Sequence, residues 1–116
     1  LPIIEMAAKL SLARQNREKF AKILSAGFAR ANPVVMQGDF SACNDLNLTE
    51  EVKKINIPTL VVCGAEDKMM PPEYSQYIKD NIPGARMALI ENSGHLVMME
   101  DPEKFNRHVR EFAGSL

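Results

Sequence analysis

The stretch "IPTLVVCGAEDKMMPP", residues 57–72, contains the pattern that decides the fold. A short apolar run, rich in β-branched residues, lies between Pro58 and Gly64, and a polar loop follows it. Such a run predicts a strand at 59–63 that is buried on both faces, as in a parallel sheet. The two prolines at the end of the stretch favour the start of a helix, "PEYSQYIKDNI", at 72–82. The stretch therefore predicts a strand, a loop and a helix in succession.

The rest of the C-terminal half repeats this order of elements. "ARMALIE", residues 85–91, predicts a second strand, and "DPEKFNRHVREFAG", residues 101–114, predicts a closing helix. Asp101 is expected to be the N-cap of that helix, with Pro102 at its first position. A helix between two parallel strands makes a right-handed βαβ unit. We therefore predict the α/β fold class, with two parallel strands in a βαβ unit plus helices.

Residues 1–54 are predicted to be a helical segment that precedes this βαβα part, 55–116. "IIEMAAKLSLA" is rich in helix formers, Asn16 is expected to cap a second helix, and Asn32-Pro33 begins a third. "NLTEEVKKI", residues 47–55, predicts a short helix capped by Thr49. Because two apolar strands cannot cover both their faces and edges, we expect the remainder of a longer chain or a second copy to complete the sheet.

The composition is that of an ordinary globular domain, with 46% hydrophobic residues, 25% charged residues and a net charge of -1. This balance argues against nucleic acid or an anionic membrane as the main partner. No apolar run approaches the roughly 18 residues of a membrane span, and no signal peptide opens the sequence. Cys43 and Cys63 lack neighbours at metal-ligand spacing, so we expect buried free thiols in the cytoplasm and no metal site.

Two polar loops follow the predicted strands. The first offers Glu66 and Asp67, and the second, "NSGH", offers His95. If the strands are adjacent and parallel, both loops leave the same end of the sheet, where active groups gather in α/β proteins. An aspartate beside an imidazole fixes its tautomer and stabilises the imidazolium, and an imidazole carries protons near neutral pH. These residues alone also allow a structural interpretation, in which Asp67 stabilises its loop and His95 is a polar turn residue.

Residues 55–114 resemble the C-terminal part of an α/β-hydrolase. A strand followed by Gly64, two residues, Asp67, three residues and Pro71 resembles the segment that carries the family's catalytic acid. "MALIENSGHLVMMEDPEKFNRHVREF" resembles the last strand, the catalytic histidine and the closing helix, whereas residues 1–50 match only loosely, like the end of a helical cap. The resemblance implies that Asp67 and His95 are the acid and base of a catalytic triad that needs no metal or organic cofactor.

The nucleophile of this family stands on a G-x-S-x-G elbow, and the sequence contains no such motif. Ser93 is expected to hydrogen-bond the backbone of its turn, and Cys43 and Cys63 lie inside predicted elements. We therefore expect a fragment of a hydrolase of ester, thioester or lactone bonds, inactive alone, whose serine, aspartate or cysteine nucleophile lies elsewhere and whose substrate is a small molecule.

Two alternatives stay open. An aspartate nucleophile in the missing elbow would direct the same acid and base to carbon–halogen bonds or epoxides. In the second alternative, the chain is a non-catalytic module that forms homo-oligomers through its exposed sheet edge, since unpaired strand edges template pairing.

Other residues near the two loops have simpler expected roles. Glu66 is expected to be a solvated loop residue, Glu100 to serve the start of the last helix, and His108 to pack or meet solvent. Three apolar residues flank the loops and are candidates for a substrate pocket or for core filling: Met69, Met70 and Leu96.

Overall fold

The computed structural model describes residues 2–116, with side chains from residue 5 onward. Its N-terminal part contains three helices: α1 (Pro2–Ser11), α2 (Arg17–Arg30) and α3 (Pro33–Asp45). Its C-terminal part contains β1 (Leu60–Gly64), α4 (Pro72–Asn81), β2 (Arg86–Ile90), α5 (Val97–Glu100) and α6 (Pro102–Gly114). Short 3₁₀ turns stand at Arg14–Asn16 and Val52–Lys54. No helix in this described part is both long and apolar enough to cross a membrane.

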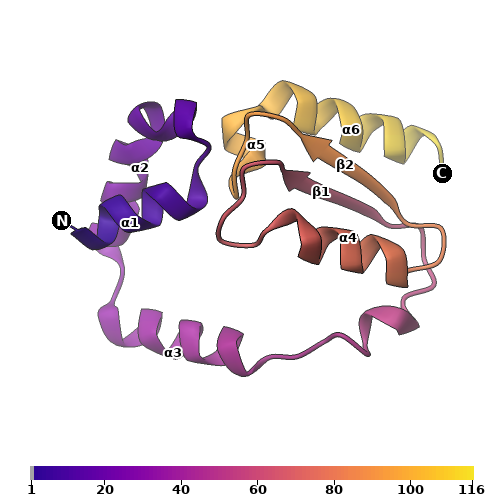
Figure 1. Cartoon of the computed structure of the whole chain (residues 1–116), viewed down its shortest axis with the longest axis horizontal. Coiled ribbons are helices and arrows are strands. Elements are labelled where there is room, and N and C mark those ends of the chain that lie inside the picture. The colour runs from indigo at the N-terminus through magenta and orange to yellow at the C-terminus, as the bar shows by residue number, and fades with distance from the viewer. Residues whose placement is uncertain (1) are drawn as a thin grey trace.

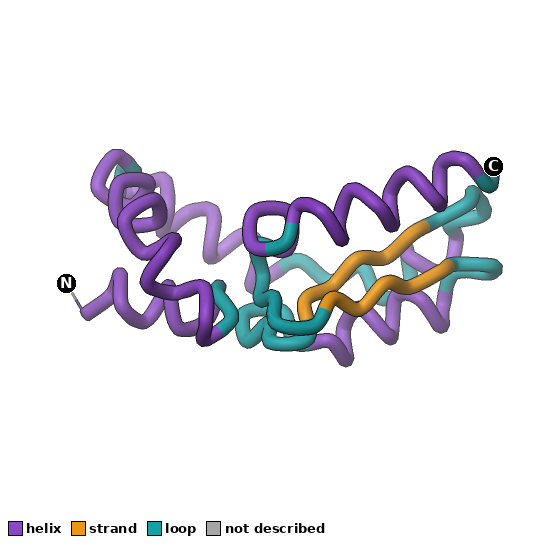
Figure 2. Tube along the Cα trace, turned by 90° about the horizontal axis from the view of Figure 1, so that it is seen from above, coloured by secondary structure: helices purple, strands orange, loops and turns teal. Residues whose placement is uncertain are grey.

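The two strands form the predicted parallel pair. Leu60 stands opposite Arg86, and the register runs to Gly64 opposite Ile90. Helix α4 connects the strands, and α4 and α6 lie on opposite sides of them (Figures 1 and 2). The α/β fold and its βαβ unit are thus confirmed. Because the strands end side by side, the loop after β1 and the turn after β2 leave the sheet at the same end.

Two of the predicted helix starts are confirmed by their caps. The side chain of Asp101 accepts a hydrogen bond from Lys104 N at 3.0 Å, and Asn32 accepts one from Val34 N at 2.9 Å. In both helices a proline follows the cap at the first position, where its missing N–H costs nothing. The start of α6 therefore follows directly from the Asp-Pro pair in the sequence.

The predicted helix over 47–55 is wrong. Only Val52–Lys54 is helical, as a 3₁₀ turn, and Thr49 caps nothing. Asn47 Oδ1 instead accepts hydrogen bonds from the backbone N–H and the hydroxyl of Thr49, at 3.1 and 2.7 Å. This local side-chain turn competes with helix formation and holds Thr49 outside it.

Helix α2 begins after Asn16, as expected, but the Asn16 side chain does not cap it. Asn16 has φ −96° and ψ −10°, whereas an N-cap whose side chain bonds the first turn usually has extended backbone. Its side chain makes no cap hydrogen bond and points to the C-terminal half of the chain.

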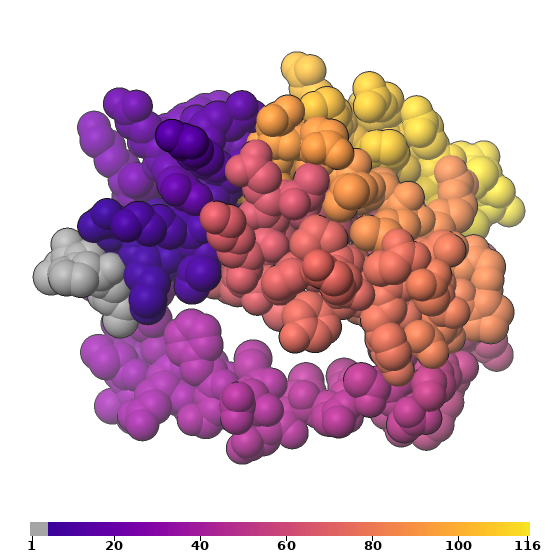
Figure 3. Space-filling view, in the orientation of Figure 1, coloured from indigo at the N-terminus to yellow at the C-terminus, as the bar shows by residue number. Residues whose placement is uncertain are grey.

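The hairpin of α1 and α2 packs against the loop end of the sheet. Leu12 is 1% exposed and forms a cluster with Ala8 and Phe20, against which Leu24 and Leu96 pack. In the space-filling view the hairpin, in indigo, abuts the segments that follow the strands (Figure 3). The hairpin thereby reaches the end of the sheet where the predicted site lies.

Helix α3 differs from the hairpin because it leaves large apolar side chains in solvent. The exposed ones include Val34, Val35, Phe40 and Leu46. Figure 3 shows an opening between α3 and the C-terminal part of the chain. This helix therefore presents an apolar surface that the described residues do not cover.

Candidate active site

Asp67 and His95 lie together at the loop end of the sheet. His95 Nδ1 is 2.9 Å from Asp67 Oδ2. The aspartate side chain is 7% exposed and the histidine side chain 35%, so the acid is enclosed and the ring reaches solvent. The parallel register explains this meeting, since β1 and β2 end at Gly64 and Ile90, directly opposite each other.

The backbone of its own loop orients the Asp67 carboxylate. Oδ1 accepts hydrogen bonds from Met69 N at 2.9 Å and Met70 N at 2.8 Å. One oxygen is therefore held by the loop after β1, residues 65–71, called the acid loop below, and the other faces the imidazole. An ionised carboxylate only accepts, so the histidine must donate from Nδ1, which leaves Nε2 of the neutral ring as an acceptor. Such a ring can take a proton from a substrate or nucleophile at Nε2.

The acid loop touches the turn after β2, residues 91–96, called the histidine turn below, backbone against backbone. A Cβ on Gly64 would collide with the carbonyl oxygens of Ser93 and Gly94 and lie 2.6 Å from the Ser93 carbonyl carbon. Glu66 N donates to Ser93 O at 2.9 Å, and Ala65 N donates to Ile90 O at 2.9 Å. Only glycine at position 64 allows the two segments to approach this closely.

The second residue of the histidine turn has left-handed backbone. Asn92 has φ 60°, a conformation that asparagine adopts more readily than most residues. Its carbonyl oxygen accepts hydrogen bonds from Asn16 Nδ2 at 3.1 Å and Gln15 Nε2 at 3.2 Å. The unusual turn is therefore held from outside, by side chains that follow α1.

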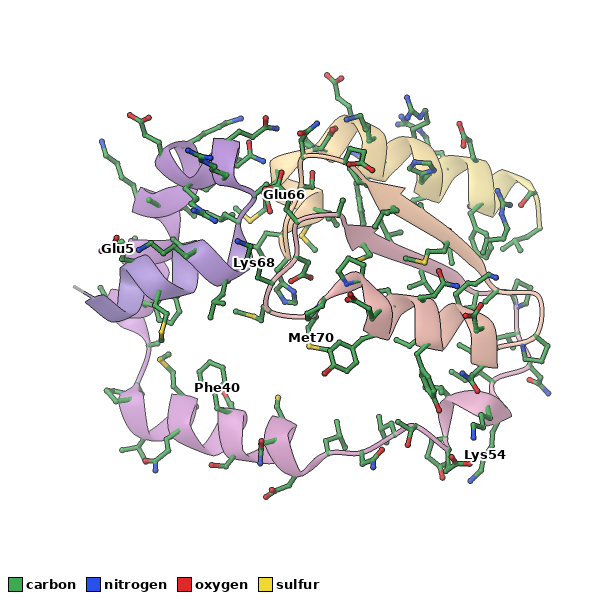
Figure 4. The ribbon with its side chains drawn as sticks, in the orientation of Figure 1. Glu5, Phe40, Lys54, Glu66, Lys68 and Met70 are labelled. Atoms are coloured by element: carbon green, nitrogen blue, oxygen red, sulfur yellow. The ribbon has the colours of Figure 1, made fainter. Side chains whose placement is uncertain are left out.

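Residues 10–16, called the clamp segment below, bind both parts of the site. Leu10 O accepts from Lys68 N at 3.2 Å, and Ser11 O accepts from His95 N at 2.8 Å. Arg14 N donates to Glu66 Oε2 at 3.1 Å. Glu66 is thus half-buried and not simply a solvated loop residue, because its side chain links the acid loop to the clamp segment. Figure 4 shows Glu66 and Lys68 on the side of the loop that faces α1.

Glu100 belongs to the candidate site, and its expected role at the start of α6 is wrong. Its side chain is buried and does not serve the start of α6. Oε1 accepts from Gly94 N at 2.9 Å, and Oε2 accepts from Ala13 N at 2.9 Å and Asn16 Nδ2 at 2.8 Å. A spacing of three residues places Glu100 on the same face of α5 as Val97, which is also buried. This spacing is the feature of the sequence that could have indicated the burial of Glu100.

Ser93 also departs from its expected role. It is completely buried, and within the described part of the chain its hydroxyl oxygen has no hydrogen-bond partner. In this turn the N–H groups of Gly94 and His95 donate to Glu100 and Ser11. No free backbone donor of these two residues is left for Ser93 Oγ.

The candidate pocket residues occupy different surroundings. Met69 and Met70 are exposed on the acid loop, whereas Leu96 packs against the cluster of α1 and α2. In Figure 4, Met70 and Phe40 point toward the same opening between the acid loop and α3. Grooves of about 750 Å³ at α1 and α2 and about 250 Å³ at α2 and α3 are lined by none of these three candidates.

The two cysteines are free, but only Cys63 is buried. The expectation of burial is wrong for Cys43, because α3 leaves it in solvent. His108 is half-buried on α6. No three histidine, cysteine, aspartate or glutamate side chains of the described residues are grouped so that they could hold a metal ion.

Comparison with known proteins identifies the family. A model of the alpha/beta hydrolase fold matches residues 2–102, and the chain belongs to this family. The chain is 37% identical over 68 residues to a proline iminopeptidase of Saccharolobus solfataricus, which is 59% of this chain and 22% of that protein.

Two solved structures extend the similarity over almost the whole chain. One is Est816, described as an N-acyl homoserine lactone degrading enzyme, with a TM-score of 0.75, 29% identity, and coverage of 95% of this chain and 46% of that one. The other is a thermophilic esterase, with a TM-score of 0.76, 26% identity, and coverage of 97% and 45%. The chain thus spans less than half of each of these relatives.

Proposed function

We propose that Asp67 and His95 are the acid and base of a serine-type hydrolase that cleaves ester, thioester or lactone bonds of small molecules. The observation that carries this proposal is the 2.9 Å contact between His95 Nδ1 and Asp67 Oδ2, in a histidine side chain that is 35% exposed. His95 Nε2 would take the proton of the nucleophile and return it to the leaving group. It would then activate water in the same way, while Asp67 holds the ring and stabilises the imidazolium.

The nucleophile is proposed to belong to the portion of the protein that this chain does not span. The sequence contains no G-x-S-x-G elbow, and the relatives are more than twice as long as the region matched here. We therefore propose that the 116-residue chain alone is inactive. The relatives that support acyl transfer include the iminopeptidase, the esterase and the lactone-degrading enzyme.

The experiment measures hydrolysis of p-nitrophenyl acetate by a protein that joins this chain to its upstream sequence. His95→Ala should lower kcat by about 10⁶-fold and Asp67→Asn by about 10⁴-fold, as in other serine-type triads. His108→Ala, which changes the other histidine of the chain, serves as the matched control and should leave kcat unchanged. Wild-type turnover in His95→Ala would contradict the proposal, and turnover by the isolated chain would place a nucleophile within it.

A second candidate function is self-association of this chain as a non-catalytic module. The observation that favours it is the apolar surface of α3, where Val34 is 76% and Phe40 60% exposed. Sedimentation velocity over a range of concentrations tests this candidate, with Phe40→Ser as the variant that should weaken association. A monomer at every concentration would contradict it.

We also propose a cytoplasmic location, since the free thiols of Cys43 and Cys63 fit a reducing compartment. Fractionation of cells that produce the protein, followed by detection of the chain in each fraction, tests this location.

A further inference from the structure

The Glu100 carboxylate joins the histidine turn to the clamp segment, which lies far from both in the sequence. It accepts N–H groups from the histidine turn at Gly94, from the end of the α1 region at Ala13, and from the Asn16 side chain. Its exposed fraction is 9%, and all three contacts are between 2.8 and 2.9 Å. A buried carboxylate that loses such partners is strongly disfavoured, so this geometry is tightly specified.

These contacts control the peptide groups on either side of the Gly94 α-carbon. The N–H of Gly94 is held by Glu100, and the N–H of His95 is held by Ser11 O at 2.8 Å. Ser11 itself is held in place because Glu100 also binds Ala13, two residues further on. The carboxylate therefore fixes both the turn and the segment on which the turn rests.

We propose that Glu100 is a positioning residue, which places the His95 ring so that its Nδ1 meets Asp67. It acts through Gly94 and the clamp segment and touches neither Asp67 nor the ring. The proposal rests on the function proposed above in one respect, namely that the placement of His95 serves catalysis. The placement itself is measurable without any substrate.

Glutamine at position 100 is the sharpest perturbation. It keeps the size of the side chain but replaces one acceptor oxygen by an NH₂ group. Whichever way the amide turns, this NH₂ group faces an N–H that the carboxylate accepted, either at Gly94 or at Ala13 and Asn16. The side chain of residue 100 must therefore lose its contact either with Gly94 or with Ala13 and Asn16, and the histidine turn loses its position relative to the acid loop.

The readout is the tautomer of His95, taken from the ¹⁵N shifts of its two ring nitrogens. The Asp67 contact requires the Nδ1–H form in the wild-type chain. Glu100→Gln should shift the neutral ring toward the Nε2–H form, as Asp67→Asn should. Glu91→Gln, an exposed residue of the same turn, is the matched control and should leave the spectrum unchanged. The chain has two histidines, so His108 provides a reference signal in each sample.

An unchanged His95 tautomer in a folded Glu100→Gln chain would overturn the proposal. If that variant fails to fold, Asn16→Ala takes its place. This substitution at a half-exposed position removes one of the three donors to the carboxylate, together with the Asn16 contact to Asn92 O. We expect a smaller shift toward Nε2–H in Asn16→Ala, and no shift there would overturn the proposal equally.

In the longer hydrolase, Glu100→Gln should lower kcat by up to about 10²-fold with KM unchanged, the effect of a misplaced catalytic group. A protein that only lost stability would regain its kcat at low temperature, whereas a misplaced ring would not. If the tautomer shifts as expected but His95→Ala leaves turnover intact, the positioning role stands and the proposed function fails. If His95→Ala abolishes turnover while Glu100→Gln changes neither tautomer nor kcat, the reverse holds.

Discussion

Replacement of Gly94 by alanine tests whether the histidine turn rests directly on the clamp segment. A Cβ at this position would lie 2.7 Å from Ser11 O, 2.8 Å from Ala13 N and 2.9 Å from the Leu12 carbonyl carbon. All three are backbone atoms, which cannot rotate away as the end of a flexible side chain does. To restore an ordinary contact of 3.4 Å, the turn and the clamp segment must separate by about 0.7 Å.

This separation would break two hydrogen bonds and leave residual strain. The bond from His95 N to Ser11 O, at 2.8 Å, would lengthen beyond useful range, and Glu100, which accepts from both Gly94 N and Ala13 N at 2.9 Å, would lose one of these two donors. Each loss costs about 1 kcal/mol, and overpacking adds about 1–3 kcal/mol. Alanine lowers the entropy of the unfolded chain, which offsets this loss of stability by about 0.4–1 kcal/mol. We therefore expect Gly94→Ala to lower the free energy of unfolding by about 3 kcal/mol.

Urea unfolding followed by circular dichroism measures this difference, with Gly38→Ala as the matched control. Gly38 lies inside α3, and nothing stands within 4 Å of its Cβ position. Alanine there should raise the free energy of unfolding by up to about 1 kcal/mol, through its helix propensity. The two substitutions thus have opposite expected signs. An unfolding midpoint for Gly94→Ala at or above that of the wild type would refute the close contact between the turn and the clamp segment.

Three further changes probe other parts of the same assembly. Gly64→Ala should push the histidine turn away from the acid loop, so that the His95 ring loses its Nδ1–H tautomer in NMR spectra, and an unaltered tautomer would count against this contact. Leu12→Ala should cost about 2–5 kcal/mol in urea unfolding, because this side chain is 1% exposed, and a smaller loss would mean that the cluster is loosely packed. Hydrogen bonds from the side chain and backbone N–H of Lys104 hold the pKa of Asp101 below its usual range. The stability that its charge adds is therefore present above the usual aspartate pKa and is lost as pH falls through the lowered one. An acid titration of helix content should show this loss in the wild type and less of it in Asp101→Asn, and identical curves would contradict it.

The elements that the sequence predicted correctly are those fixed by local rules. The run before Gly64 became β1, and Asp101 with its proline began α6, since burial periodicity and cap chemistry act over a few residues. The parallel pairing of the strands then followed from the βαβ order, and it brought Asp67 and His95 together. The geometry of the acid and histidine was therefore accessible from the sequence.

The errors concern side chains whose partners lie far along the chain. Asn16 is of a residue type that often caps helices, but its amide donates to Asn92 O and to Glu100. Both partners lie far along the chain, so the local sequence does not predict these contacts. Glu100 stands next to a helix start, where a carboxylate is normally favourable, yet its partners lie within the histidine turn and after α1. Local rules assign such residues to the nearest helix end and so miss their tertiary role.

The contacts of the candidate site fall into two groups by their separation along the chain. Asp67 and His95 are 28 residues apart and belong to one βαβ unit, which sets their approximate geometry. The contacts that complete the histidine turn span 84 residues between Asn16 and Glu100 and 87 between Ala13 and Glu100. The turn therefore reaches its final form only when the clamp segment has docked. Because Ser11 O holds His95 N directly, a displacement of α1 must either break this bond or carry the histidine backbone with it. The helical part of the chain thus takes part in placing the proposed base.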